Sequence, residues 1–99
     1  MTGDATTLVV RDDRERSRFE ALDADGAVAA YSEYQRYDDR IVFLHTEVDP
    51  AYEGRGVGST LVRTALDGVR ATDLRVVATC PFVKAWIERH PSYDALLHR

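Results

Sequence analysis

The segment DPAYEGRGVGSTLVRTAL, residues 49–66, decides the fold that we expect, because its pattern changes in the middle. Three glycines alternate with other residues in its first half. Apolar residues then recur at helical spacing, at Leu61, Val62, Ala65 and Leu66. Glycine tolerates positive φ and lets a backbone approach its neighbours closely. The segment therefore predicts a glycine-rich loop that leads directly into an amphipathic helix.

Strands precede this segment, and a second strand–helix pair follows it. We expect strands over residues 7–11, 19–22, 27–36, 41–48 and 74–80, with turns over residues 12–17, 23–26 and 38–39. The apolar run at residues 41–44 predicts a strand buried on both faces. Pro81 suits the first position of a helix that Pro91 ends, and Phe82 and Trp86, four residues apart, are expected in the core.

The expected order is β-β-β-β-α-β-α, an α/β (α+β) class of fold. A strand–helix–strand crossover places residues 41–48 and 74–80 side by side as a parallel pair. The earlier hairpins make the rest of the sheet antiparallel, so we expect a mixed, mostly antiparallel sheet with helices packed against it. Residues 1–99 are expected to form one domain.

The composition excludes several classes of function. The chain has 99 residues, is 44% hydrophobic and 30% charged, and carries a formal net charge of −4. An acidic balance argues against nucleic acid as a partner, and no apolar run suits a membrane span. One cysteine and three histidines without ligand spacing predict no metal site. The single cysteine fits a reducing compartment, so we expect a cytoplasmic protein.

The glycine loop is a candidate anion site. It stands between a strand and a helix, where backbone N–H groups lack intrahelical partners and the helix dipole favours negative charge. Arg55 adds a cation, and Ser59 and Thr60 add hydroxyls. The loop lacks the Lys-Ser/Thr ending of a P-loop and does not match G-x-G-x-x-G. The alternative is a plain strand-to-helix turn.

The segments HTEVDPAYEGRGVGSTLV, CPFVKAWIERHPSY and RFEALDADGAVAAYSEY resemble minimal single-domain GCN5-related N-acetyltransferases along nearly the whole chain. The resemblance implies the acyl-CoA N-acyltransferase fold and acetyl-CoA as cosubstrate. Its pyrophosphate would lie on the loop amides and its pantetheine arm between the parallel strands. The residues implied in binding are Val48, Glu53, Gly54, Arg55, Gly56, Val57, Gly58, Ser59 and Cys80.

Two positions depart from the family pattern. The motif begins with Arg or Gln, whereas this chain has Glu53, and we expect Arg55 to compensate. Many members also carry a tyrosine on the last helix that protonates the departing thiolate. The corresponding stretch here has Trp86 and Ile87, and Tyr93 lies beyond Pro91.

Three residues are candidates for catalysis. Cys80 ends a strand next to a helix start, where a thiolate is stabilised, and the resemblance also implies it as a nucleophile. The alternative is a small buried residue. By the two-residue period of a strand, His45 and Glu47 share the face of Ile41 and Phe43, and either could be a general base. For His45 the alternative is a core histidine.

The expected function is acetyl-CoA-dependent transfer to a small amine or a protein amine, either directly or through an acetyl-Cys80 intermediate. The turn at residues 12–17 is too short for the helices that usually enclose the acceptor, so an open acceptor side is expected. One alternative is a non-catalytic acyl-CoA-binding or interaction module. Another is a binder of a different phosphate ligand.

Overall fold

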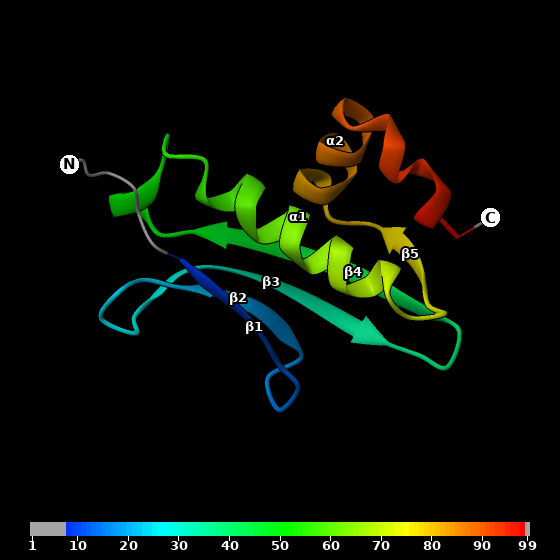
Figure 1. The fold of residues 1–99 in the computed structure, drawn as a ribbon, viewed down its shortest axis with the longest axis horizontal. Coiled ribbons are helices and arrows are strands. Elements are labelled where there is room, and N and C mark those ends of the chain that lie inside the picture. Colours follow the sequence, from blue (N-terminus) through cyan, green and yellow to red (C-terminus); the bar gives the residue numbers. More distant parts are fainter. Residues whose placement is uncertain (1–7, 99) are drawn as a thin grey trace.

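The computed structural model describes residues 8–98, which form a five-stranded sheet with two α-helices and two short 3₁₀ helices (Figure 1). The elements in chain order are β1 (Val9–Asp13), β2 (Arg18–Leu22), β3 (Val28–Arg36), β4 (Arg40–Val48), η1 (Pro50–Tyr52), α1 (Val57–Arg70), β5 (Arg75–Ala78), α2 (Pro81–Arg89) and η2 (Pro91–Leu96).

The sheet has the strand order β1-β2-β3-β4-β5, antiparallel from β1 to β4 and parallel between β4 and β5. The predicted element order and the parallel pair are thereby confirmed. The first strand was predicted two residues too short, because Asp12 and Asp13 still pair with β2. Residues 1–6 and part of the strand predicted from residue 7 lie outside the described residues.

The core lies between the sheet and α1. The helix buries one stripe of residues, namely Val57, Leu61, Val62, Ala65, Leu66 and Val69. Phe19, Tyr34 and Phe43 meet this stripe from three strands, with ring centroids 5.2 to 6.5 Å apart. Figure 1 shows α1 along the sheet and α2 beside it. The helices therefore bury one face of the sheet together.

An extra residue in β4 changes which side chains face the core. Tyr34 of β3 pairs with Phe43, and its neighbour Glu33 pairs with His45, so Leu44 has no partner in the ladder. Such a bulge shifts the two-residue alternation of a strand by one. Ile41 and Phe43 are buried, whereas the side chain of Leu44 is 45% exposed. The prediction that this strand is buried on both faces was wrong.

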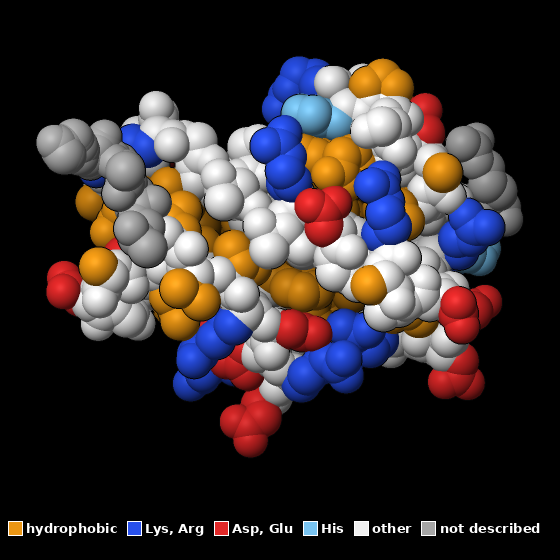
Figure 2. Space-filling view, viewed as in Figure 1, with side chains coloured by type: hydrophobic (Ala, Val, Ile, Leu, Met, Phe, Trp, Pro, Cys, Tyr) orange, Lys and Arg blue, Asp and Glu red, His pale blue; other side chains and the backbone are white. Residues whose placement is uncertain are grey.

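The opposite face of the sheet carries charged side chains. Glu20 is only 1% exposed there, and it accepts hydrogen bonds from Arg11 Nε at 2.8 Å and Arg18 Nε at 2.7 Å. Burial alone would raise the pKa of Glu20, but the two guanidinium groups outweigh it and lower that pKa. In Figure 2, basic and acidic side chains alternate along the lower edge of the molecule. This face is stabilised by ion pairs rather than by a covering helix.

No helix within residues 8–98 is long and apolar enough to cross a membrane.

Glu20→Gln is expected to lower the free energy of unfolding at about pH 7 by about 1–3 kcal/mol, because two charged donors lose their ionised partner. The lowered pKa means that this stabilisation is complete above the ordinary value of 4.5 and is lost as pH falls through the folded-state pKa. Urea unfolding at about pH 7 and about pH 3 should therefore show a difference from wild type that narrows in acid. Glu33→Gln, on β3, is the control. An unchanged difference at both pH values would contradict the assignment.

Candidate functional site

A cavity of about 490 Å³ opens where the late part of β4 meets the start of α1. It is lined by Thr46, Glu47, Val48, Tyr52, Glu53, Gly54, Gly56, Val57, Gly58, Ser59 and Phe82. These residues come from β4, from the loop between β4 and α1, from the first turn of α1 and from α2. Two segments far apart in the sequence thus form its opposite walls.

The cavity exists because β4 and β5 stop pairing halfway along β4. The parallel ladder ends at Phe43 and Ala78. The carbonyl of Phe43 then accepts both the Cys80 N–H, at 2.9 Å, and the Thr79 hydroxyl, at 2.7 Å. Beyond this point β4 continues to Val48, while the other chain turns into α2. The gap between them lies at the carboxyl ends of two parallel strands, where α/β sheets bind ligands.

The glycine loop presents free backbone N–H groups to this cavity. Gly54 and Gly56 have φ values of +80° and +75°, which residues with a side chain adopt at a cost. Thr60 donates the first bond of α1, to the carbonyl of Gly56, and no side chain caps the helix start. The N–H groups of the first turn therefore have no acceptor within the helix, and they form the positive end of the helix dipole.

Gly58 makes room for neighbouring side chains. A Cβ atom at this position would lie 2.6 Å from Cζ of Phe82 and 3.1 Å from Cγ2 of Val48. Phe82 was predicted to belong to the core, and that prediction was wrong: its ring is 37% exposed and lines the cavity. Trp86, one turn later, is fully buried as predicted, and its indole N–H donates to Ser59 Oγ at 2.8 Å.

Tyr52 joins the rim of the cavity to the hairpin between β2 and β3. Its hydroxyl donates to Asp23 Oδ2 at 2.7 Å, which raises the pKa of Tyr52 and lowers that of Asp23. The same carboxylate accepts N–H bonds from Asp25 and Ala27 within the hairpin. The hairpin therefore holds the glycine loop in place through Tyr52.

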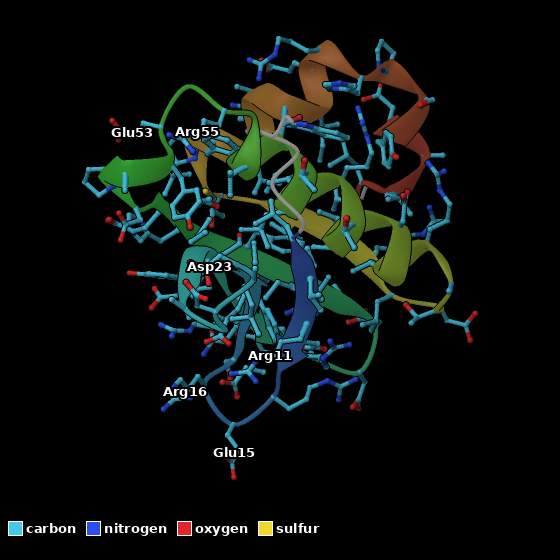
Figure 3. The ribbon with its side chains drawn as sticks, turned by 60° about the vertical axis from the view of Figure 1, so that its left-hand side comes forward. Arg11, Glu15, Arg16, Asp23, Glu53 and Arg55 are labelled. Atoms are coloured by element: carbon cyan, nitrogen blue, oxygen red, sulfur yellow. The ribbon has the colours of Figure 1, made fainter. Side chains whose placement is uncertain are left out.

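The two charged residues of the loop lie differently. Glu53 borders the cavity, whereas Arg55 is exposed outside its lining, with Cζ 5.8 Å from the centre of the Tyr52 ring. Figure 3 shows both on the loop that enters α1 and Asp23 on the hairpin nearby; Glu15 and Arg16 lie at the far end of the sheet, on the turn between β1 and β2. An anion in the cavity would meet the loop amides beside the Glu53 carboxylate.

Cys80 lies behind the cavity wall rather than in it. It is 2% exposed, and its Sγ is 3.3 Å from the Thr46 hydroxyl, which does line the cavity. Thr46 also lies 2.9 Å from the hydroxyl of the fully buried Ser32. Thr46 thus separates the sulfur from the cavity.

His45 and Glu47 occupy the other face of β4. The bulge at Leu44 overturns the prediction that they share the face of Ile41 and Phe43, because alternation restarts one residue late. Their side chains are both 53% exposed, and His45 Nε2 lies 3.0 Å from Glu47 Oε2. His45 is therefore not a core histidine.

Glu47 nevertheless borders a cavity on each side of the end of β4. It lines the main cavity, and it also lines a second cavity of about 320 Å³ with Arg18, Tyr31 and Asp49. Val48 is common to both cavities as well. The end of β4 is thus the wall between them.

The remaining candidates do not reach the cavity. Tyr93 packs against Trp86 and donates its hydroxyl to Asp67 at 2.8 Å. Ile87 is buried. Within residues 8–98, no three His, Cys, Asp or Glu side chains gather as metal ligands.

Three lining residues escaped the sequence-based prediction, namely Thr46, Tyr52 and Phe82. The two-residue period of β4 places Thr46 on the same face as Val48, which was predicted to bind, and could have identified it. Phe82 could have been found from its position in the first turn after Pro81, facing the loop rather than the sheet.

The architecture and the cavity define a class of protein. The fold resembles the NMR solution structure of a GCN5-like protein from Staphylococcus aureus, with a TM-score of 0.70 and 26% identity over 92% of this chain and 88% of that one. Residues 18–96 match the model of the family described as GCN5-related N-acetyl-transferase.

Relatives cover most of the chain as well. Protein NATD1 of Gallus gallus is 36% identical over 92 residues, 92% of this chain and 84% of the relative. Protein NATD1 of Mus musculus is 36% identical over 83 residues, 83% of this chain and 76% of the relative. The chain belongs to the GCN5-related N-acetyltransferase family, and its class of enzyme is the acyltransferases.

Two glycines of α1 allow a matched test of this geometry. Gly58→Ala is expected to lower the free energy of unfolding by about 0–1 kcal/mol, because displacing the Phe82 ring offsets the usual gain of alanine in a helix. Gly68→Ala meets no atom within 4 Å and should raise it by about 0.5–1 kcal/mol. Denaturant unfolding of both variants measures the two effects. Equal effects in the two variants would contradict the close contact of Phe82 with Gly58.

Proposed function

We propose that this chain transfers the acetyl group of acetyl-CoA to an amine. The observation that carries the proposal is the row of free N–H groups at the start of α1, facing a cavity where two parallel strands separate. Backbone amides at a helix N-terminus bind phosphate oxygens. Family membership supports the same cosubstrate.

The lining residues fit acetyl-CoA. The amides of Gly56, Gly58 and Ser59 would hold the pyrophosphate, while Val48 and Phe82 offer apolar walls to the pantetheine arm. Acetyl-CoA brings an acetyl group already activated as a thioester. The chain then has to hold this group in the cavity and admit an amine beside it.

The acceptor would approach from the open face of the sheet. Leu44, His45 and Glu47 are about half exposed there. The turn between β1 and β2 spans only residues 14–17, too few for a covering helix. Glu47, at the wall between the two cavities, is the general base that this geometry favours, with His45 bonded to it. An open face suits either a small amine or a protein amine.

A second function is a non-catalytic acyl-CoA-binding module. It is favoured by the Glu53 carboxylate beside the proposed phosphate site, which opposes tight binding of an anion. It is also favoured by the position of Tyr93, whose hydroxyl bonds Asp67 away from the cavity. Both functions require CoA to bind at the glycine loop.

Calorimetric titration with acetyl-CoA, CoA and ATP tests the site. Glu53→Gln is expected to tighten the binding of CoA by about threefold to tenfold, because it removes a negative charge beside the pyrophosphate. Arg55→Gln should weaken it by a similar factor, the more so at low salt. Glu15→Gln, at the opposite end of the sheet (Figure 3), is the charge-matched control and should change nothing.

If neither CoA nor acetyl-CoA binds the wild-type protein while ATP does, the proposed function is wrong. If both bind but Glu53→Gln leaves the affinity unchanged, the pyrophosphate does not lie on the glycine loop.

A further inference from the structure

Two buried groups and one partly buried group form a continuous chain of contacts across three segments. Ser32 on β3 lies 2.9 Å from Thr46 on β4, and Thr46 lies 3.3 Å from the sulfur of Cys80 at the start of α2. Ser32 and Cys80 are 0% and 2% exposed. Of the three, only Thr46 lines the cavity.

The donors and acceptors of this chain can be counted. A hydroxyl has one proton to donate and two lone pairs that accept, and a thiol has one weak donor. When the Ser32 hydroxyl and the Cys80 thiol both donate to Thr46 Oγ1, they fill its two lone pairs. The proton of Thr46 then has no partner within the cluster. Because Thr46 lines the cavity, a ligand there can accept this proton.

Thr46 also lies at the end of the cavity that is opposite the glycine loop. The anion site lies at the glycine loop, and the cavity-lining part of β4 runs back from there through Val48 and Glu47 to Thr46. Thr46 is the lining residue of β4 furthest along the strand from the loop. The reactive end of a ligand anchored by its phosphates extends away from the anchor, toward Thr46.

We propose that the Thr46 hydroxyl donates its proton to the CoA sulfur that leaves during acetyl transfer. The Cys80 thiol then donates a proton to Thr46. This assignment rests on the function proposed above. It gives Thr46 the role of a catalytic acid and Cys80 that of a proton donor, in a chain whose Tyr93 hydroxyl is bonded elsewhere.

The step balances. The amine nitrogen forms a bond to the acetyl carbon, and the carbon–sulfur bond breaks with its electron pair on sulfur. That sulfur takes the Thr46 proton, Thr46 takes the Cys80 proton, and the attacking nitrogen releases one proton to the base. After the products leave, the base gives its proton to water in the cavity, and water returns a proton to Cys80 through Thr46, so that both groups regain their starting states. The net transfer is one proton from nitrogen to sulfur.

The burial of Cys80 favours this role over that of a nucleophile. A nucleophile has to reach the thioester carbon, but the Cys80 sulfur is 2% exposed and lies behind the Thr46 side chain. A proton needs only the hydrogen-bonded path, which is present.

The test compares CoA with desulfo-CoA, which lacks the sulfur. A donor aimed at the sulfur stabilises the thiolate form, so CoA should bind more tightly relative to desulfo-CoA as pH rises from about 7 to about 9.5. The expected gain in relative affinity is about tenfold, the factor that corresponds to lowering the thiol pKa by about one unit. The titratable groups around the cavity are Glu47, Tyr52, Glu53 and Cys80. Their effects on the part that both ligands share cancel in the ratio. Their effects on the sulfur itself remain in the Thr46 variants, which keep these groups and so separate them from the Thr46 hydroxyl.

The variants separate a proton donor from a structural group. Thr46→Val should abolish the pH-dependent gain, and Thr46→Ser should retain it because the hydroxyl remains. Thr60→Val, which removes an exposed hydroxyl outside the cavity lining, should behave as wild type. Intact-mass measurement after incubation with acetyl-CoA should find Cys80 unmodified.

The outcomes distinguish the two proposals. Failure of the wild type to bind either ligand would overturn the proposed function. If both ligands bind with the same pH dependence, the assignment of Thr46 as proton donor is wrong and the proposed function stands. The assignment of the proton donor is also wrong if the pH-dependent gain in affinity for CoA persists in Thr46→Val, or if Cys80 carries an acetyl group.

Discussion

The unpaired residue Leu44 in β4 determines the chemistry available on either side of the sheet. Before it, Ile41 and Phe43 pack in the core; after it, Thr46 and Val48 take the inner face, while His45 and Glu47 take the outer one. The bulge comes directly after the point where β5 stops pairing. Strand separation and the change of face therefore coincide, and together they leave a cavity with a hydroxyl inside and a carboxylate at its outer wall.

The glycine loop supplies the second requirement, an electropositive end to that cavity. Positive φ at Gly54 and Gly56 turns the chain into α1, and the missing side chain at Gly58 lets Phe82 close the opposite wall. Glu53 works against this arrangement. A site with free amides and one nearby carboxylate binds an anion more weakly than the amides alone would.

Much of the fold followed from sequence patterns, since periodicity, glycines and prolines are local signals. The element order, the parallel pair and the glycine loop were all predicted this way. The faces of β4 could not be, because the bulge depends on how two strands pair and leaves no mark in the composition of residues 41–48. Thr46 could have been predicted from its two-residue spacing to Val48. The helical spacing of Phe82 to Trp86 indicated a core residue, whereas Phe82 lines the cavity. Contacts such as Tyr52 with Asp23 join segments 29 residues apart, which no local pattern reveals.

The central claim is that the amides at the start of α1 bind the pyrophosphate of CoA. Titration of the ¹⁵N-labelled protein with CoA, followed by amide chemical shifts, tests it residue by residue. The account predicts that the largest shifts occur at Gly54, Gly56, Gly58 and Ser59. Saturable shifts confined to another region, such as the cavity lined by Asp39, Asp73 and Arg75, or no shift at the loop, would contradict it.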